Sequence, residues 1–113
     1  MTPAVSRMIA AKQQDMAYTM RLYSIANLWR YEPGARGRRH RHAVQEETFV
    51  VMDGTLTIYI GAPAERVEVP TGGAVTVPGG VALQSATHGN ADLLVYAYGY
   101  PPDQGAEVLD PVV

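Results

Sequence analysis

The chain has 113 residues, 47% of them hydrophobic, which suits one globular domain and leaves no room for a second core. Nine basic and eleven acidic residues give a formal net charge of −2, so nothing in the composition favours nucleic acid or a membrane surface as a partner. The absence of cysteine excludes disulfides and thiolate metal sites. No apolar run approaches the roughly 20 residues that span a bilayer, and charges and glutamines interrupt any signal-peptide core at the N-terminus. We therefore expect a cytoplasmic protein.

The N-terminal part predicts β-structure after a less regular start. Apolar residues alternate through residues 16–31, with residues 16, 18, 20 and 22 as one alternate set, and Trp29 and Tyr31 share a face. Residues 32–35 (EPGA) are typical of a turn. We interpret residues 1–27 as an N-terminal arm or additional strand, whose apolar alternation offers a dimer contact.

Six strand-like runs follow, separated by turn residues. Residues 48–52 and 55–60 are rich in β-branched and apolar residues and flank Asp53-Gly54, a dipeptide typical of a two-residue hairpin. The later runs are residues 66–69, 74–77, 81–87 and 93–98. Prolines in residues 101–113 predict an extended C-terminal tail.

Short strands at this spacing, with no convincing long helix, indicate an all-β fold. Periodicity alone does not choose between a barrel, a jelly roll and an immunoglobulin-like sandwich.

The residues with the clearest chemistry are His40, His42 and Glu47. On a strand, side chains at positions i and i+2 project to the same face, so the two imidazoles converge on one point. A turn between His42 and Glu47 would return the carboxylate to the same pocket. Two imidazoles and a carboxylate suit a divalent transition metal such as manganese, iron, nickel, copper or zinc.

The spacing around these residues resembles the first motif of the cupin superfamily. The pattern is Gly34, five residues, His40-x-His42, four residues, Glu47, six residues, Gly54. The resemblance implies one small cupin barrel, a double-stranded β-helix of jelly-roll type, over residues 28–100. It also implies that the two histidines and the glutamate are metal ligands inside the barrel, and that the chain forms a homodimer, as small single cupins do.

The second cupin motif starts correctly and then departs from the family. Gly72, five residues and Pro78-x-Gly80 match, but Leu83 stands where the family's fourth ligand, a histidine, is expected, and Thr87 replaces an asparagine. We include Gln84 as a candidate ligand through its amide oxygen, on condition that a β-bulge turns it inward, since simple alternation sends it the other way.

Other polar residues are assigned to the surface or the pocket mouth. His88 lies in a turn, His88-Gly89-Asn90, where exposure is expected. Arg39 and Arg41 alternate with the histidines and should face outward. Arg36 and Arg38 precede the strand at the pocket mouth, where they would attract an anion such as a carboxylate.

The leading functional hypothesis is a metal-dependent enzyme acting on a small organic molecule. Dioxygenase, isomerase and decarboxylase chemistry are all compatible with the resemblance. The alternative is a non-catalytic cupin without bound metal that binds or senses a small ligand, with Leu83 making its pocket more apolar.

Overall fold

The computed structural model describes residues 25–102 and 105–113, and the described residues form nine β-strands. They are β1 Ile25–Tyr31, β2 His40–His42, β3 Glu46–Asp53, β4 Thr55–Ile60, β5 Glu65–Pro70, β6 Ala74–Val77, β7 Leu83–Ala86, β8 Leu93–Tyr100 and β9 Ala106–Val108. Within the described residues, there is no helix long and apolar enough to cross a membrane.

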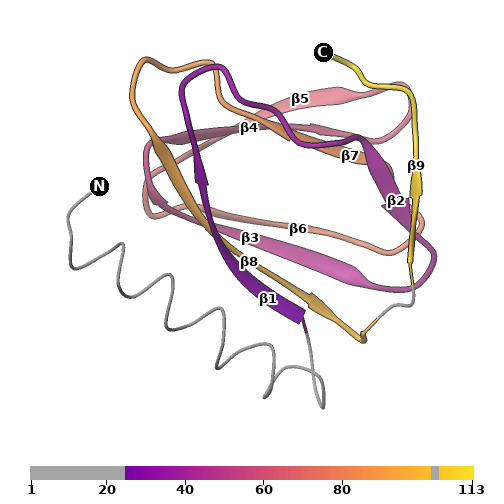
Figure 1. Cartoon of the computed structure of the whole chain (residues 1–113). Coiled ribbons are helices and arrows are strands. Elements are labelled where there is room, and N and C mark those ends of the chain that lie inside the picture. Colours follow the sequence, from indigo (N-terminus) through magenta and orange to yellow (C-terminus); the bar gives the residue numbers. More distant parts are fainter. Residues whose placement is uncertain (1–24, 103–104) are drawn as a thin grey trace.

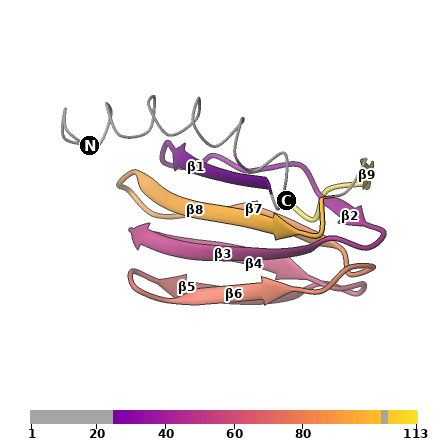
Figure 2. The same cartoon turned by 90° about the horizontal axis from the view of Figure 1, so that it is seen from below.

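The strands form two sheets that face each other (Figure 1). One sheet has the order β1-β8-β3-β6 and the other β5-β4-β7-β2-β9, and all the pairings within them are antiparallel. Figure 2 shows the strands stacked one above another, with β2 and β9 together at one end of the molecule. This arrangement is the all-β double-stranded β-helix expected from the sequence.

The hydrophobic core lies between the two sheets. Strand residues of alternating parity face inward from both sheets and are almost fully buried. They are Phe49, Val51, Leu56, Ile58, Val69, Val77, Leu83, Leu93, Val95 and Ala97. Because Phe49 and Val51 share the parity of Glu47, the face that carries this carboxylate continues directly into the core.

The expected hairpin at Asp53-Gly54 is wrong, although the turn itself is present. Strand β3 pairs with β6 and β8, whereas β4 pairs with β5 and β7, so the chain passes at Gly54 from one sheet to the other. A register shift between Val51 and Asp53 redirects β3 before this corner. Gly54 has a φ of 94°, a backbone conformation that residues other than glycine rarely adopt.

Both ends of the described chain take part in the sheets. β1 begins at Ile25 and pairs along its whole length with β8, which confirms a strand in the second half of residues 16–31. Residues 16–22 and the dimer contact expected there lie outside the described residues. In the expected C-terminal tail, residues 106–108 form β9, which pairs with β2. The tail is therefore partly a sheet edge.

Candidate metal centre

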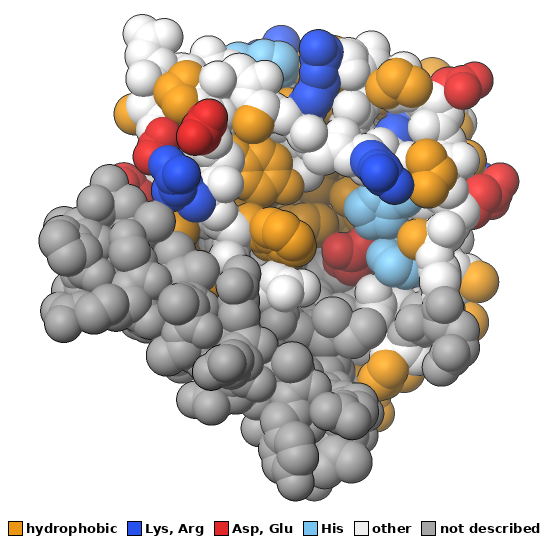
Figure 3. All heavy atoms as spheres, viewed as in Figure 1, with side chains coloured by type: hydrophobic (Ala, Val, Ile, Leu, Met, Phe, Trp, Pro, Cys, Tyr) orange, Lys and Arg blue, Asp and Glu red, His pale blue; other side chains and the backbone are white. Residues whose placement is uncertain are grey.

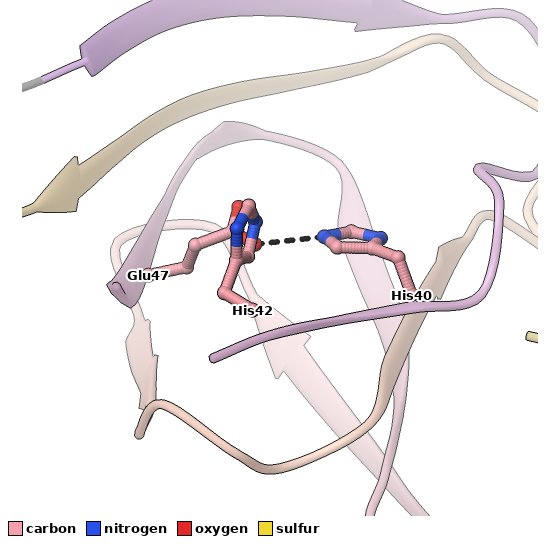
Figure 4. A group of neighbouring side chains, drawn as sticks. All are labelled: His40, His42 and Glu47. Carbon is pink, nitrogen blue, oxygen red and sulfur yellow. Dashed lines mark hydrogen bonds and ion pairs between the residues drawn. The ribbon is translucent and has the colours of Figure 1, made fainter. Parts of the chain in front are cut away.

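His40, His42 and Glu47 converge on one point (Figure 4). The Nε2 atoms of both histidines lie 2.8 Å from the same carboxylate oxygen, Oε1 of Glu47. The two imidazole rings are 5.0 Å apart between centroids and nearly perpendicular, at 88°. One ligand atom from each residue lies within 4.8 Å of the others. The structure thus brings together the three residues that the sequence spacing singled out.

Local strand geometry explains this convergence. His40 and His42 are the first and last residues of β2, so their side chains leave the same face. Glu47 is the second residue of β3, where it is paired with Val77 on one side and Gly99 on the other. The short bend between β2 and β3 returns the carboxylate to the face that carries the imidazoles.

The orientation of His40 is fixed from both sides of its ring. Nδ1 lies 2.9 Å from the carbonyl oxygen of Arg38, while Nε2 faces Glu47. The hydrogen bond to Glu47 raises the pKa of His40 above its ordinary value, burial opposes that rise, and the bond to the Arg38 carbonyl adds to it. With an acceptor at each nitrogen, the ring in the metal-free protein is best satisfied as an imidazolium.

This donor set fits a divalent transition metal. A ligating histidine typically donates its second ring N–H to a backbone carbonyl or carboxylate, which aims the other nitrogen at the ion. His40 has this arrangement through Arg38. The Nε2 atom of His40 and the carboxylate oxygen of Glu47, which face each other here, are the atoms that would serve as ligands to a metal ion. His40, His42 and Glu47 would therefore hold the ion.

Leu83 lies where the resemblance placed a fourth ligand. It is opposite His40 in the pairing of β2 with β7, it is 2% exposed, and it belongs to the hydrophobic core. Directly opposed residues on paired strands project to the same face, so Leu83 presents an apolar side chain beside the imidazole. Among the residues that the structure describes, the candidate ligand set thus has three members.

The structure corrects the interpretation of Gln84 as a ligand. Strand β7 keeps a regular register against β4, without the bulge that would turn Gln84 inward. Its Oε1 instead accepts hydrogen bonds from the amides of Val112 (2.7 Å) and Val113 (3.3 Å). Its Nε2 donates to the carbonyls of Gly37 and Val113. Simple alternation, which sends neighbouring side chains to opposite faces, applies here.

Two of the three residues, His40 and Glu47, line a cavity of about 640 Å³. Figure 3 shows a hollow with apolar side chains at its centre, an acidic side chain and two histidines at one side, and basic side chains at its rim. Its apolar wall includes Trp29, Phe49, Leu83 and Ala97. Trp29 is 48% exposed and lines this cavity.

A pair of hydroxyl groups in the cavity wall was missed by sequence reasoning. Tyr31 Oη and Ser85 Oγ lie 2.6 Å apart, and both residues line the cavity. Burial raises the pKa of the Tyr31 phenol, the hydrogen bond with Ser85 opposes the rise, and the negative charge of Glu47 adds to it. Tyr31 therefore stays a hydrogen-bond donor at neutral pH. The sequence alternation correctly placed Tyr31 on the same face as Trp29, but it could not identify Ser85 on β7 as the partner of Tyr31.

The four arginines at positions 36, 38, 39 and 41 lie where the sequence predicted them. Arg36 and Arg38 are exposed, line the cavity, and form no ion pair with any described residue. Arg39 and Arg41 face away from the cavity toward the C-terminal residues, where Arg41 pairs with Glu107 at 2.6 Å. His88 is exposed and its Nε2 lies 3.0 Å from Tyr59 Oη, away from the metal-ligand cluster.

Comparison with known proteins adds a family match and several similar folds. The family described as "Cupin domain" matches residues 27–98. A double-stranded β-helix protein from Klebsiella pneumoniae superposes with a TM-score of 0.72, at 17% identity, over 79% of this chain and 76% of that one. A sugar phosphate isomerase of the cupin superfamily from Silicibacter pomeroyi gives 0.66 at 24% identity, over 79% and 58%. An oxalate oxidase in complex with the substrate analogue glycolate gives 0.69 at 19%, over 78% and 47%. At these identities the similarity concerns the fold.

A curated relative matches only a short stretch. A histidine–tRNA ligase from Leptospira biflexa is 48% identical over 42 residues, which are 37% of this chain and 10% of that protein. The chain thus spans about a tenth of the length of the curated relatives it matches.

Proposed function

Because the chain belongs to the cupin domain family, with residues 27–98 matching it, we propose that it is a metal-dependent enzyme acting on a small organic acid. His40, His42 and Glu47 would hold one divalent transition-metal ion. The observation that carries this proposal is the approach of both Nε2 atoms to the same oxygen of Glu47, at 2.8 Å, beside the cavity. When bound, the ion supplies Lewis-acid or redox chemistry to a ligand in the cavity.

The three-residue ligand set supports a catalytic rather than a structural metal. Structural sites are usually closed by four protein ligands, whereas catalytic sites keep a position open for water or substrate. Leu83 occupies the fourth-ligand position and supplies no donor atom. Its side chain also makes the wall beside His40 apolar, which would lower the local dielectric and strengthen charge interactions there.

Charge and shape favour an anionic substrate. Arg36 and Arg38 line the cavity without ion-pair partners among the described residues, while Arg30, also at the cavity, is paired with Glu32 and Asp92. An unpaired guanidinium binds a carboxylate through two parallel N–H donors. The hydroxyl pair of Tyr31 and Ser85 adds neutral donors deeper in the same wall. These groups would orient a small carboxylate with one end toward the three metal ligands.

The test loads untagged protein separately with manganese, iron, nickel, copper and zinc and offers it a panel of small carboxylic acids, with oxalate and glycolate included. Substrate loss is followed by NMR and dioxygen uptake by electrode. We expect metal-dependent conversion of at least one acid by the wild type and none by Glu47→Gln. The Arg36→Gln/Arg38→Gln variant should mainly raise KM. Absence of conversion with every metal, together with binding of an acid to the metal-free protein, would overturn the proposal in favour of a non-catalytic binding cupin.

A further inference from the structure

Strand β2, which carries both histidines, is supported mainly from its outer edge. On its inner side β7 pairs with it at a single position, His40 with Leu83. On its outer side β9 pairs with all three of its residues, His40 with Val108, Arg41 with Glu107, and His42 with Ala106. One further inner contact is the hydrogen bond from the amide of Gly80 to the carbonyl of His42, at 2.6 Å. The position of the two imidazoles thus depends on β9.

Residues 105–113, which we call the C-terminal clamp, are attached to the loop before β2 as well as to β2. The amide of Leu109 donates to the carbonyl of Arg39 at 2.8 Å, and the Arg39 guanidinium donates to the carbonyl of Asp110 at 3.2 Å. Arg41 donates to Glu107 at 2.6 Å, with both side chains well exposed. Exposed ion pairs contribute little, about 0–1 kcal/mol, so the pair of Arg41 and Glu107 by itself adds little to the attachment of the clamp.

Gln84 provides the buried attachment that the surface contacts lack. It is 1% exposed, and both ends of its amide are used: Oε1 accepts from the amides of Val112 and Val113, and Nε2 donates to the carbonyls of Val113 and Gly37. Gly37 lies in the loop that leads into β2. A single side chain of β7 therefore joins the end of the clamp to that loop. The side-chain amide can do so because it carries both N–H donors and an acceptor oxygen.

We propose that Gln84 is a positioning residue for the metal centre: through the C-terminal clamp it holds β2, and with it His40 and His42, in register. Gln84 lies next to Leu83 in sequence but acts from the opposite face of the sheet. Loss of its hydrogen bonds would release residues 112–113, loosen β9, and leave β2 with its single inner pairing. The effect on metal affinity rests on the function proposed above, whereas the effect on β2 does not.

The experiment measures hydrogen–deuterium exchange by mass spectrometry on metal-free full-length Gln84→Met, which keeps the side-chain length and removes all the hydrogen bonds. Thr57→Val is the matched control, because Thr57 is equally buried on β4 but bonds to Glu68 of the neighbouring strand β5. We expect exchange in β2 and β9 to accelerate by about tenfold in Gln84→Met, the size of effect that losing buried hydrogen bonds produces. Exchange in β3 and β8 should stay unchanged, and β2 should be unaffected in Thr57→Val.

A second arm measures cobalt(II) affinity by equilibrium dialysis, where the dissociation constant should rise about tenfold in Gln84→Met only, as for loss of an outer-shell support. If the wild type binds no cobalt, the metal function fails while the exchange arm still decides the clamp. Should Gln84→Met fail to fold, Gln84→Glu, which keeps the shape of the side chain and loses both Nε2 donations, should selectively accelerate exchange in β2 and β9. Unchanged exchange in β2, or acceleration spread evenly over all strands, would overturn the proposal.

Discussion

At the scale of single residues, the candidate metal centre combines three donor side chains with one apolar neighbour. His40, His42 and Glu47 share a point of approach, and Leu83 sits opposite His40 on the adjacent strand. Leu83 belongs to the hydrophobic core, so the wall beside the three candidate ligands is well packed although it offers no fourth ligand. Packing of the core thus accounts for the apolar side chain beside the three candidate ligands.

The Leu83→His variant tests this view of the wall. An imidazole opposite His40 would face the same point and complete a four-residue ligand set, so we expect cobalt(II) affinity to rise about 10- to 100-fold, the range over which ligand support alters affinity. Leu83→Met, which keeps volume without adding an imidazole, should bind cobalt as the wild type does. Isothermal titration at constant pH provides the measurement. Equal affinities in all three proteins would show that position 83 does not face the ion.

The raised pKa of His40 predicts a pH dependence of stability in the metal-free protein. Since the pKa is raised in the folded state, chiefly by Glu47, the charged ring stabilises the fold fully below its unfolded value near 6.5. That contribution is lost as the pH rises through the folded pKa. In EDTA, the stability difference between wild type and His40→Gln should therefore be larger at about pH 5.5 than at about pH 8.5. Urea unfolding measures it; a difference that grows toward high pH would contradict the assignment.

At the scale of elements, the sequence predicted where the strands lie better than it predicted which strands pair with each other. The runs around Phe49 and Ile58 are correct, because alternation and β-branched residues are local signals. Their pairing is not local: β3 and β4 join different sheets, since long-range contacts with β8 and β7 outweigh the hairpin preference of Asp53-Gly54. Strand β9 gave no signal because all three of its residues are exposed and carry no alternation.

The corner between β3 and β4 leads to a stability prediction. Gly54 has a φ of 94°, and a Cβ there would lie 3.0 Å from the carbonyl oxygen of Asp92. Gly54→Ala should therefore lower the free energy of unfolding by about 1–3 kcal/mol. Gly89→Ala is the control, because its Cβ would meet only Thr87 Oγ1, at 3.9 Å. Thermal and urea unfolding should separate the two variants; similar losses would show that the corner is not strained.

At the scale of the whole molecule, the site joins one sheet to the other. Glu47 belongs to the sheet β1-β8-β3-β6, and the histidines belong to the sheet β5-β4-β7-β2-β9. Motif spacing was sufficient to predict this meeting point from the sequence, because the residues lie within one short connection. The hydroxyl pair of Tyr31 and Ser85 and the role of Gln84 were not predictable, since their partners are distant in sequence and depend on the folded pairing.

A metal bridging the two sheets should stabilise the entire fold. A ligand that binds only the native state stabilises it by about 2.7 kcal/mol at a concentration of 100 Kd. We expect cobalt(II) to raise the Tm of the wild type in calorimetry, with a smaller or no rise for Glu47→Gln. A Tm increase of the same size in both proteins would locate the binding elsewhere.

The metal content of untagged protein is the most direct test of the metal centre. After saturation with cobalt(II) and removal of excess metal, elemental analysis should find one ion per chain in the wild type and in His88→Ala, whose histidine lies on an exposed turn. His42→Ala should retain almost none, because it removes one of the three converging donors. Equal cobalt in His42→Ala and the wild type, or none in the wild type, would contradict the assignment of His40, His42 and Glu47 as a metal site.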